Sequence, residues 1–157
     1  MLTDAPPACD VASHRLYVAY GSNMCRLQMA SRCPGATTVA VATLAGWRFR
    51  INREGYATLV ADPAALAHIL IWDLDAQGEH NLDVYEEVDA GLYRKETISV
   101  PGFGEALIYL AADARSGRPQ PGYLERIVAA AEAAGFPPSY VAERAAWHSG
   151  DGELPGR

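Results

Sequence analysis

Two stretches of the sequence contain residue types that could act together on a substrate. The first is Tyr20–Met24 (YGSNM), which follows the apolar run Leu16–Ala19 and precedes residues with helical spacing. We expect a strand, a turn that glycine permits, and the start of a helix capped by Ser22 or Asn23. Amides at such a helix start can hold a carboxylate, or a carbonyl oxygen that becomes negative. The turn is therefore a candidate anion or oxyanion site, although it can also be a simple connection.

The second stretch, residues 82–93 (LDVYEEVDAGLY), is rich in carboxyl groups. Such a cluster is usually a solvated helix end. Here it lies between an apolar helix face and a strand that begins at Tyr93, so one carboxyl group can point inward. Partial burial would raise its pKa towards the range that is useful for proton transfer. This stretch therefore contains a candidate general acid and base.

Other potential chemistry is less well supported. Ser22 lacks the G-x-S-x-G pattern of a nucleophile elbow, and Cys25 can be a packing residue as readily as a reactive thiol. Gly102–Gly104 lacks the strand and helix that flank a nucleotide-binding loop, so we read it as a turn. The histidines, at positions 14, 68, 80 and 148, are far apart and give no metal-ligand spacing.

Composition limits the class of protein. The chain has 157 residues, half of them hydrophobic, which suits one domain with a sizeable core. A net charge of −6 disfavours nucleic acid as a partner, and no apolar run could cross a membrane. Three cysteines without C-x-x-C spacing suit a reducing compartment, and without an evident export signal we expect a cytoplasmic location. We expect residues 1–14 to be a disordered tail, 15–147 a single domain, and 148–157 a second tail.

The elements that must position these residues follow from periodicity and turn signals. Strands are predicted at 15–19, 37–51 (one long strand or two), 56–60 (ending at Asp62-Pro63), 67–74, 93–100 and 105–112. Helices are predicted at 23–32, at 75–85 with Asp75 as cap, at 124–134 and at 137–147. The fold class is therefore α+β, with about six mostly antiparallel strands whose edges must close or be covered.

A series of motifs covers most of the chain. They are YGSNM, GYATL, ILIWDL, LDVYEEVDAGLYRK, ALIYLA, and PGYL followed by AGFPPSY. In this order they resemble the γ-glutamylcyclotransferase (AIG2-like) family, including its bacterial members. The resemblance extends from about residue 15 to residue 146.

The resemblance implies a small mixed β-barrel with flanking helices, and an activity without metal or organic cofactor. The α-amine of a γ-glutamyl group would attack its own γ-carbonyl, giving 5-oxoproline and a free amine or amino acid. Glu86 matches the glutamate of the family's L-D-x-x-E motif and would act as general acid and base. The implied substrate loop comprises Tyr17, Val18, Ala19, Tyr20, Gly21, Ser22 and Asn23, and the implied pocket tyrosines are Tyr109 and Tyr123.

One residue departs from the family pattern. The family usually has glycine after the glutamate, where this chain has Glu87, and we expect its side chain to face solvent. The leaving group is left open: it could belong to a γ-glutamyl amino acid, a biosynthetic intermediate or a carrier protein. A non-catalytic binding protein on the same scaffold is a further alternative. The expected partner is a small γ-glutamyl molecule, with no nucleic acid or membrane, and the protein is expected to be a monomer or homodimer.

Overall fold

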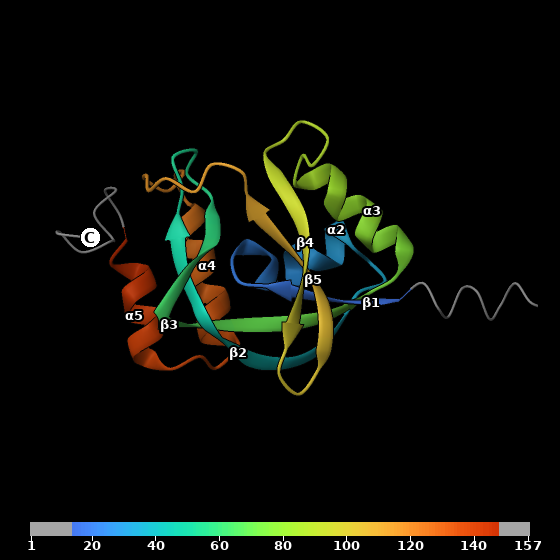
Figure 1. The fold of residues 1–157 in the computed structure, drawn as a ribbon, viewed down its shortest axis with the longest axis horizontal. Helices are drawn as coiled ribbons and strands as arrows, with labels where there is room; N and C mark the ends of the chain where they lie inside the picture. Colours follow the sequence, from blue (N-terminus) through green and yellow to red (C-terminus); the bar gives the residue numbers. More distant parts are fainter. Residues whose placement is uncertain (1–13, 148–157) are drawn as a thin grey trace, which may run out of the picture.

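The computed structural model describes residues 14–147 (Figure 1). In chain order the elements are β1 (Arg15–Ala19), η1 (Ser22–Met24), α2 (Arg26–Arg32), β2 (Thr37–Ile51), β3 (Ala57–Leu74), α3 (Ala76–Tyr85), β4 (Tyr93–Val100), β5 (Gly104–Ala111), α4 (Tyr123–Ala133) and α5 (Pro138–Ala145). The tails expected at 1–14 and 148–157 lie outside the described residues, except for His14.

The strands form one five-stranded sheet in the order β2-β3-β1-β5-β4. Neighbours pair antiparallel except β1 and β5, which run parallel, so the α+β, mostly antiparallel class is confirmed. In this part of the chain the sheet is not closed into a barrel, because β2 and β4 lie at the two ends of the order. The short β1 lies in the middle, which brings the turn that follows it to the centre of the molecule.

The predicted strands 56–60 and 67–74 are one continuous strand, β3, so the expected end at Asp62-Pro63 is wrong. The physical reason lies in β2, which is long enough to pair with both halves of β3. β2 bends at Gly46 (φ +89°), between the two segments that pair with β3. The pairing register shifts at this bend, and residues 62–65 of β3 lie opposite it. Pro63 is tolerated because an irregular ladder does not need its missing N–H group.

The predicted helix 23–32 is divided into η1 and α2 by Cys25, whose backbone is extended. Neither Ser22 nor Asn23 caps a helix with its side chain, which corrects the expectation. The other helices match their predictions closely. The Asp75 carboxylate accepts a hydrogen bond from the Gly78 amide at 2.7 Å and caps α3 as predicted.

The core follows the middle of the sheet. Its fully buried side chains include Val18 of β1, Ile69 and Ile71 of β3, and Leu107 and Ile108 of β5. Figure 1 shows α4 and α5 together at one end of the molecule and α2 and α3 at the other, with the β4-β5 hairpin between them. None of the helices within 14–147 is long and apolar enough to span a bilayer.

Candidate active site

A cavity of about 220 Å³ lies where the end of β1 meets the end of α3. Elements far apart in the sequence form its wall: η1, the starts of β3, β4 and α4, and the second half of β5. The lining residues are Tyr17, Tyr20, Gly21, Ser22, Asn23, Tyr56, Ala57, Tyr85, Glu86, Glu87, Leu92, Tyr93, Tyr109 and Tyr123. The two stretches singled out in the sequence therefore share one cavity.

The turn after β1 is packed tightly against β3. A Cβ atom on Gly21 would lie 3.0 Å from the Ala57 Cβ and 3.6 Å from the Tyr123 hydroxyl oxygen. Gly21 has a negative φ of −131°, so the close approach of Ala57 is what demands a glycine here. The turn continues into η1, in which the Met24 amide donates to the Gly21 carbonyl oxygen at 3.0 Å.

Glu86 follows the last turn of α3, and its amide donates to the Leu82 carbonyl oxygen at 2.7 Å. The Asn23 side-chain amide donates to the Glu86 carboxylate at 3.2 Å and to the Tyr17 hydroxyl at 2.9 Å. Burial raises the pKa of Glu86 to about 7, against the opposing effects of the Arg32 charge and the Asn23 hydrogen bond. A carboxyl group with this pKa exchanges a proton readily near neutral pH.

Arg32, the last residue of α2, orients the Asn23 amide. Its guanidinium donates to the Asn23 side-chain oxygen and to the Tyr85 hydroxyl, and it lies 3.5 Å above the centre of the Tyr85 ring. Because the oxygen of Asn23 is held by Arg32, its NH₂ group faces Glu86. The sequence analysis missed Arg32, and only its place at the end of a helix that follows the turn could have suggested it.

The tyrosines of the cavity differ in whether their hydroxyl hydrogen is already donated to another group. Tyr20 and Tyr93 donate to the carbonyl oxygens of Tyr109 and Ala57, respectively. The hydroxyls of Tyr17 and Tyr123 instead accept hydrogen bonds, the latter from the Ala57 amide at 3.0 Å. Burial raises the pKa of both groups, so each stays neutral and keeps a hydrogen that it can donate.

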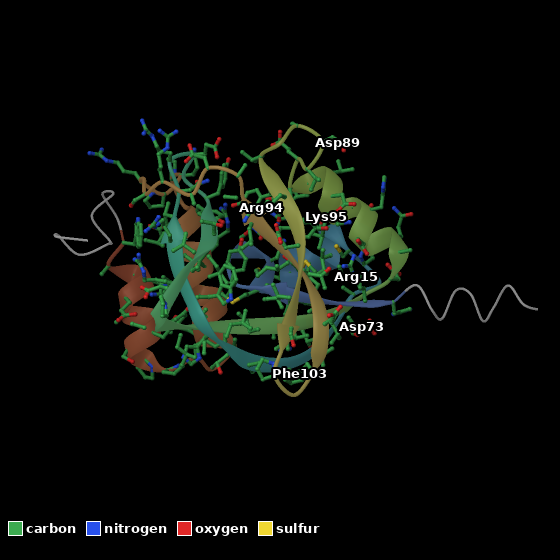
Figure 2. The ribbon with its side chains drawn as sticks, in the orientation of Figure 1. Arg15, Asp73, Asp89, Arg94, Lys95 and Phe103 are labelled. Atoms are coloured by element: carbon green, nitrogen blue, oxygen red, sulfur yellow. The ribbon has the colours of Figure 1, made fainter. Side chains whose placement is uncertain are left out.

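Tyr109 is held by an ionic network beside the cavity. Its hydroxyl donates to the Asp83 carboxylate at 2.7 Å, and the Lys95 ammonium donates to the same carboxylate at 3.1 Å. The Glu79 carboxylate accepts from both Lys95 and Arg15. Figure 2 shows Arg15 and Lys95 on the side of the molecule where α3 lies. The network ties α3 to three strands and therefore fixes the helix that precedes Glu86.

Most of the residues proposed from the sequence meet in the cavity. Tyr17, Tyr20, Gly21, Ser22, Asn23, Glu86, Tyr109 and Tyr123 all line it. Val18 and Ala19 do not, because both are buried in the core between β3 and β5. Sequence reasoning missed Tyr56, Tyr85 and Tyr93 as lining residues, although the motifs GYATL and LDVYEEVDAGLY contain them.

Glu87 is exposed, as expected, and lies at the edge of the cavity. Its φ of +53° is the left-handed conformation, which favours glycine. Within 14–147, no group of three His, Cys, Asp or Glu side chains could hold a metal ion. The polar groups of the residues that line the cavity are one carboxyl group with a raised pKa, one exposed carboxylate, amides, the Ser22 hydroxyl and phenol hydroxyls.

Comparisons with known proteins agree with the motifs. Residues 68–143 match the AIG2-like family, whereas the curated proteins give no match. A solved structure named gamma-glutamyl cyclotransferase has a TM-score of 0.76 at 24% identity, with 92% of each chain covered. An uncharacterized protein from Homo sapiens also gives 0.76 at 24% identity, covering 87% of this chain and 89% of that one. YkqA from Bacillus subtilis gives 0.71 at 20% identity, covering 90% of this chain but 58% of that one.

Fold and site together define a small α+β protein in which a partly buried carboxyl group and a strand-to-helix turn share an aromatic cavity. The match of residues 68–143 to the AIG2-like family and the shared architecture agree with the resemblance that the motifs indicate. At these identities the solved structures establish a common fold.

Proposed function

We propose that the protein is an enzyme that converts γ-glutamyl amines or γ-glutamyl amino acids into 5-oxoproline and the free amine or amino acid. The observation that carries this proposal is the position of Glu86, whose carboxyl group lies in the cavity 3.2 Å from the Asn23 side chain. The name of the gamma-glutamyl cyclotransferase structure that shares this fold supports the same reaction class. Metal and organic cofactors are not part of the proposed mechanism.

In the proposed reaction, Glu86 relays protons from the attacking nitrogen to the leaving nitrogen and is restored at the end. Its carboxylate takes a proton from the substrate α-ammonium, and the freed amine attacks the γ-carbonyl carbon. The Glu86 carboxyl group gives this proton to the leaving nitrogen as the tetrahedral intermediate expels it. The regenerated carboxylate then takes the second proton from the attacking nitrogen and passes it to the released amine, which departs as an ammonium ion. A new C–N bond replaces the broken one, so the step needs no co-reactant. A pKa of about 7 suits Glu86 for both directions of transfer.

The other groups of the cavity would stabilise charge and fold the substrate. We assign the amides of Gly21 to Asn23 to the γ-carbonyl oxygen as it becomes negative, an interaction of a kind worth about 3 kcal/mol. The Tyr17 and Tyr123 hydroxyls, each with a hydrogen left to donate, suit the substrate α-carboxylate. A cavity of about 220 Å³ is small, so it favours the folded-back conformer needed for five-membered ring closure.

Two alternatives remain distinct from this reading. The leaving group could belong to a biosynthetic intermediate or a carrier protein, and assays with γ-glutamyl-alanine, the γ-glutamyl-lysine isopeptide and glutathione would separate these substrates. A non-catalytic binding protein is the other alternative. Binding alone does not require a carboxyl group whose pKa is raised to about 7, and this argues for the enzyme. The cytoplasmic location and the monomer or homodimer stay predictions.

The proposal is tested by replacing the proton carrier. Glu86→Gln keeps the size of the side chain but cannot accept the proton, and we expect 5-oxoproline release to fall at least roughly 100-fold. Glu105→Gln, an exposed residue on β5, is the matched control and should keep full activity. Appreciable turnover by a folded Glu86→Gln protein would remove Glu86 from this role.

A further inference from the structure

The cavity has a buried floor and an exposed mouth. Nine of the lining residues are buried, among them the turn Tyr20–Asn23 and the tyrosines 17, 93, 109 and 123. Three lining residues are exposed: Tyr56, Tyr85 and Glu87. Glu86 and Leu92 lie between these two groups in exposure. If the glutamyl group occupies the floor beside Glu86, its leaving amine must extend through the mouth.

The charges of this cavity have one sign. Its ionisable lining residues other than tyrosine are Glu86 and Glu87, and the fourteen lining residues include no Lys, Arg or His. Arg32 is not a lining residue, but its guanidinium donates to Asn23 and Tyr85 and lies 3.5 Å above the centre of the Tyr85 ring. A leaving amine in the mouth therefore meets the Glu87 carboxylate and the Tyr56 ring, while Arg32 occupies one face of the Tyr85 ring.

The hollow that adjoins the cavity at Leu92 does not change this balance. It is lined by two basic and two acidic side chains, Arg50, Arg115, Glu54 and Asp113. The Arg115 guanidinium and the Asp113 carboxylate are paired at 2.8 Å, so their charges largely cancel. Of the three lining residues exposed at the mouth, Glu87 is thus the one that bears a carboxyl group.

The backbone holds Glu87 firmly in this place. Its amide donates to the Val84 carbonyl oxygen and its own carbonyl accepts from the Leu92 amide, both at 3.1 Å. The left-handed conformation of Glu87 is strained for a residue other than glycine. A charged side chain is therefore present where glycine would be less strained.

We propose that Glu87 is a specificity-determining residue that favours γ-glutamyl substrates whose leaving amine carries a second positive charge, as in a diamine. This inference rests on the proposed function, and it names the substrate class for the same cavity. An ammonium group in the mouth is attracted by the Glu87 carboxylate and by the ring of Tyr56. A carboxylate on the leaving amine, as in an amino acid, is repelled by Glu87.

The test uses three γ-glutamyl compounds that differ in the charge at the far end of the leaving amine. Their leaving amines are 1,4-diaminobutane, butylamine and 4-aminobutanoate. Because Glu87 is exposed, we expect a gain in kcat/KM of roughly three- to fivefold for the cationic over the neutral compound, and a comparable loss for the anionic one. The preference should weaken as salt concentration rises.

Glu87→Gln should make the three compounds nearly equal, whereas Glu105→Gln should keep the preference. Equal kcat/KM for all three compounds with the unchanged protein would overturn the proposal, as would a preference that survives in Glu87→Gln. Absence of 5-oxoproline from all three and from γ-glutamyl-alanine would instead refute the proposed reaction. Calorimetric Kd values of the Glu86→Gln protein for the same compounds would then decide the charge preference without turnover: stronger binding of the cation supports it, and equal binding overturns it.

Discussion

At the scale of single residues, the site depends on the environment of one carboxyl group. Burial disfavours the charged form of Glu86, whereas the Arg32 charge and the Asn23 amide favour it. The balance leaves the pKa at about 7 instead of its ordinary 4.5. Such a group is costly for the fold whenever it is ionised, because the unfolded chain solvates it better.

Glu86→Gln is therefore expected to stabilise the protein in alkaline solution. The folded-state pKa is raised, so the stability of the unchanged protein falls as pH rises from about 4.5 to about 7 and is constant above that. Glutamine carries no such cost, and the variant should be more stable by about 1–3 kcal/mol at pH 8. Near pH 4 the difference should vanish. Urea unfolding at pH 8 and at pH 4 measures the free energy of unfolding of both proteins. The same difference between them at the two pH values would contradict the raised pKa of Glu86.

At the scale of elements, the site is assembled where a short central strand stops. The sheet places β1 between β3 and β5, so the turn after β1 emerges among the starts of β3 and α4. The Tyr123 hydroxyl and the Ala57 amide join α4 to β3 beside this turn, and the Tyr93 hydroxyl joins β4 to the Ala57 carbonyl oxygen. Ala57 is thus a point at which three elements and the turn meet.

Gly21→Ala is expected to force β3 away from the turn. Its added Cβ would lie 3.0 Å from the Ala57 Cβ, which is on a paired strand and cannot rotate aside. We expect a loss of stability of about 1–3 kcal/mol. The sharper measurement is a double-mutant cycle: Ala57→Gly removes the clashing methyl and should restore part of the stability lost in Gly21→Ala. Additive effects of the two substitutions would contradict direct contact.

Sequence and structure agree where a local signal decides the outcome. The Asp75 cap, the β4-β5 hairpin and the apolar spacing of α4 were predicted closely because each depends on neighbouring residues. The continuity of β3 could not be predicted, since it depends on a long partner, β2, rather than on the turn residues Asp62-Pro63. The capping role expected for Asn23 failed because its side chain is used by Arg32 and Glu86 instead.

The candidate site was predictable to a similar extent. The strand and turn pattern selected the turn, the resemblance to the family's L-D-x-x-E motif selected Glu86, and the fold brings them into one cavity. The residues that affect the pKa of Glu86 and the orientation of Asn23 could not be predicted from the sequence. Arg32 and Tyr85 are 53 positions apart and meet only through packing, so no local pattern indicates their contact.

At the scale of the whole molecule, the proposed cyclisation requires that Glu86 at the end of α3, the turn after β1 and the tyrosine-lined wall act as one unit. In that proposal proton transfer, charge stabilisation and substrate folding would be supplied by different elements, so none of these parts would suffice alone. The ionic network of Arg15, Glu79, Lys95 and Asp83 joins α3 to the strands and so holds the helix in a fixed position relative to them.

The most direct test is the pH dependence of kcat/KM for 5-oxoproline release. The base must be ionised to accept the proton, so we predict that kcat/KM rises with pH and that this rise has a midpoint near 7, the pKa of Glu86. A rise centred near 4.5, or the same profile and rate in a folded Glu86→Gln protein, would contradict the assignment of Glu86 as the group that moves the proton.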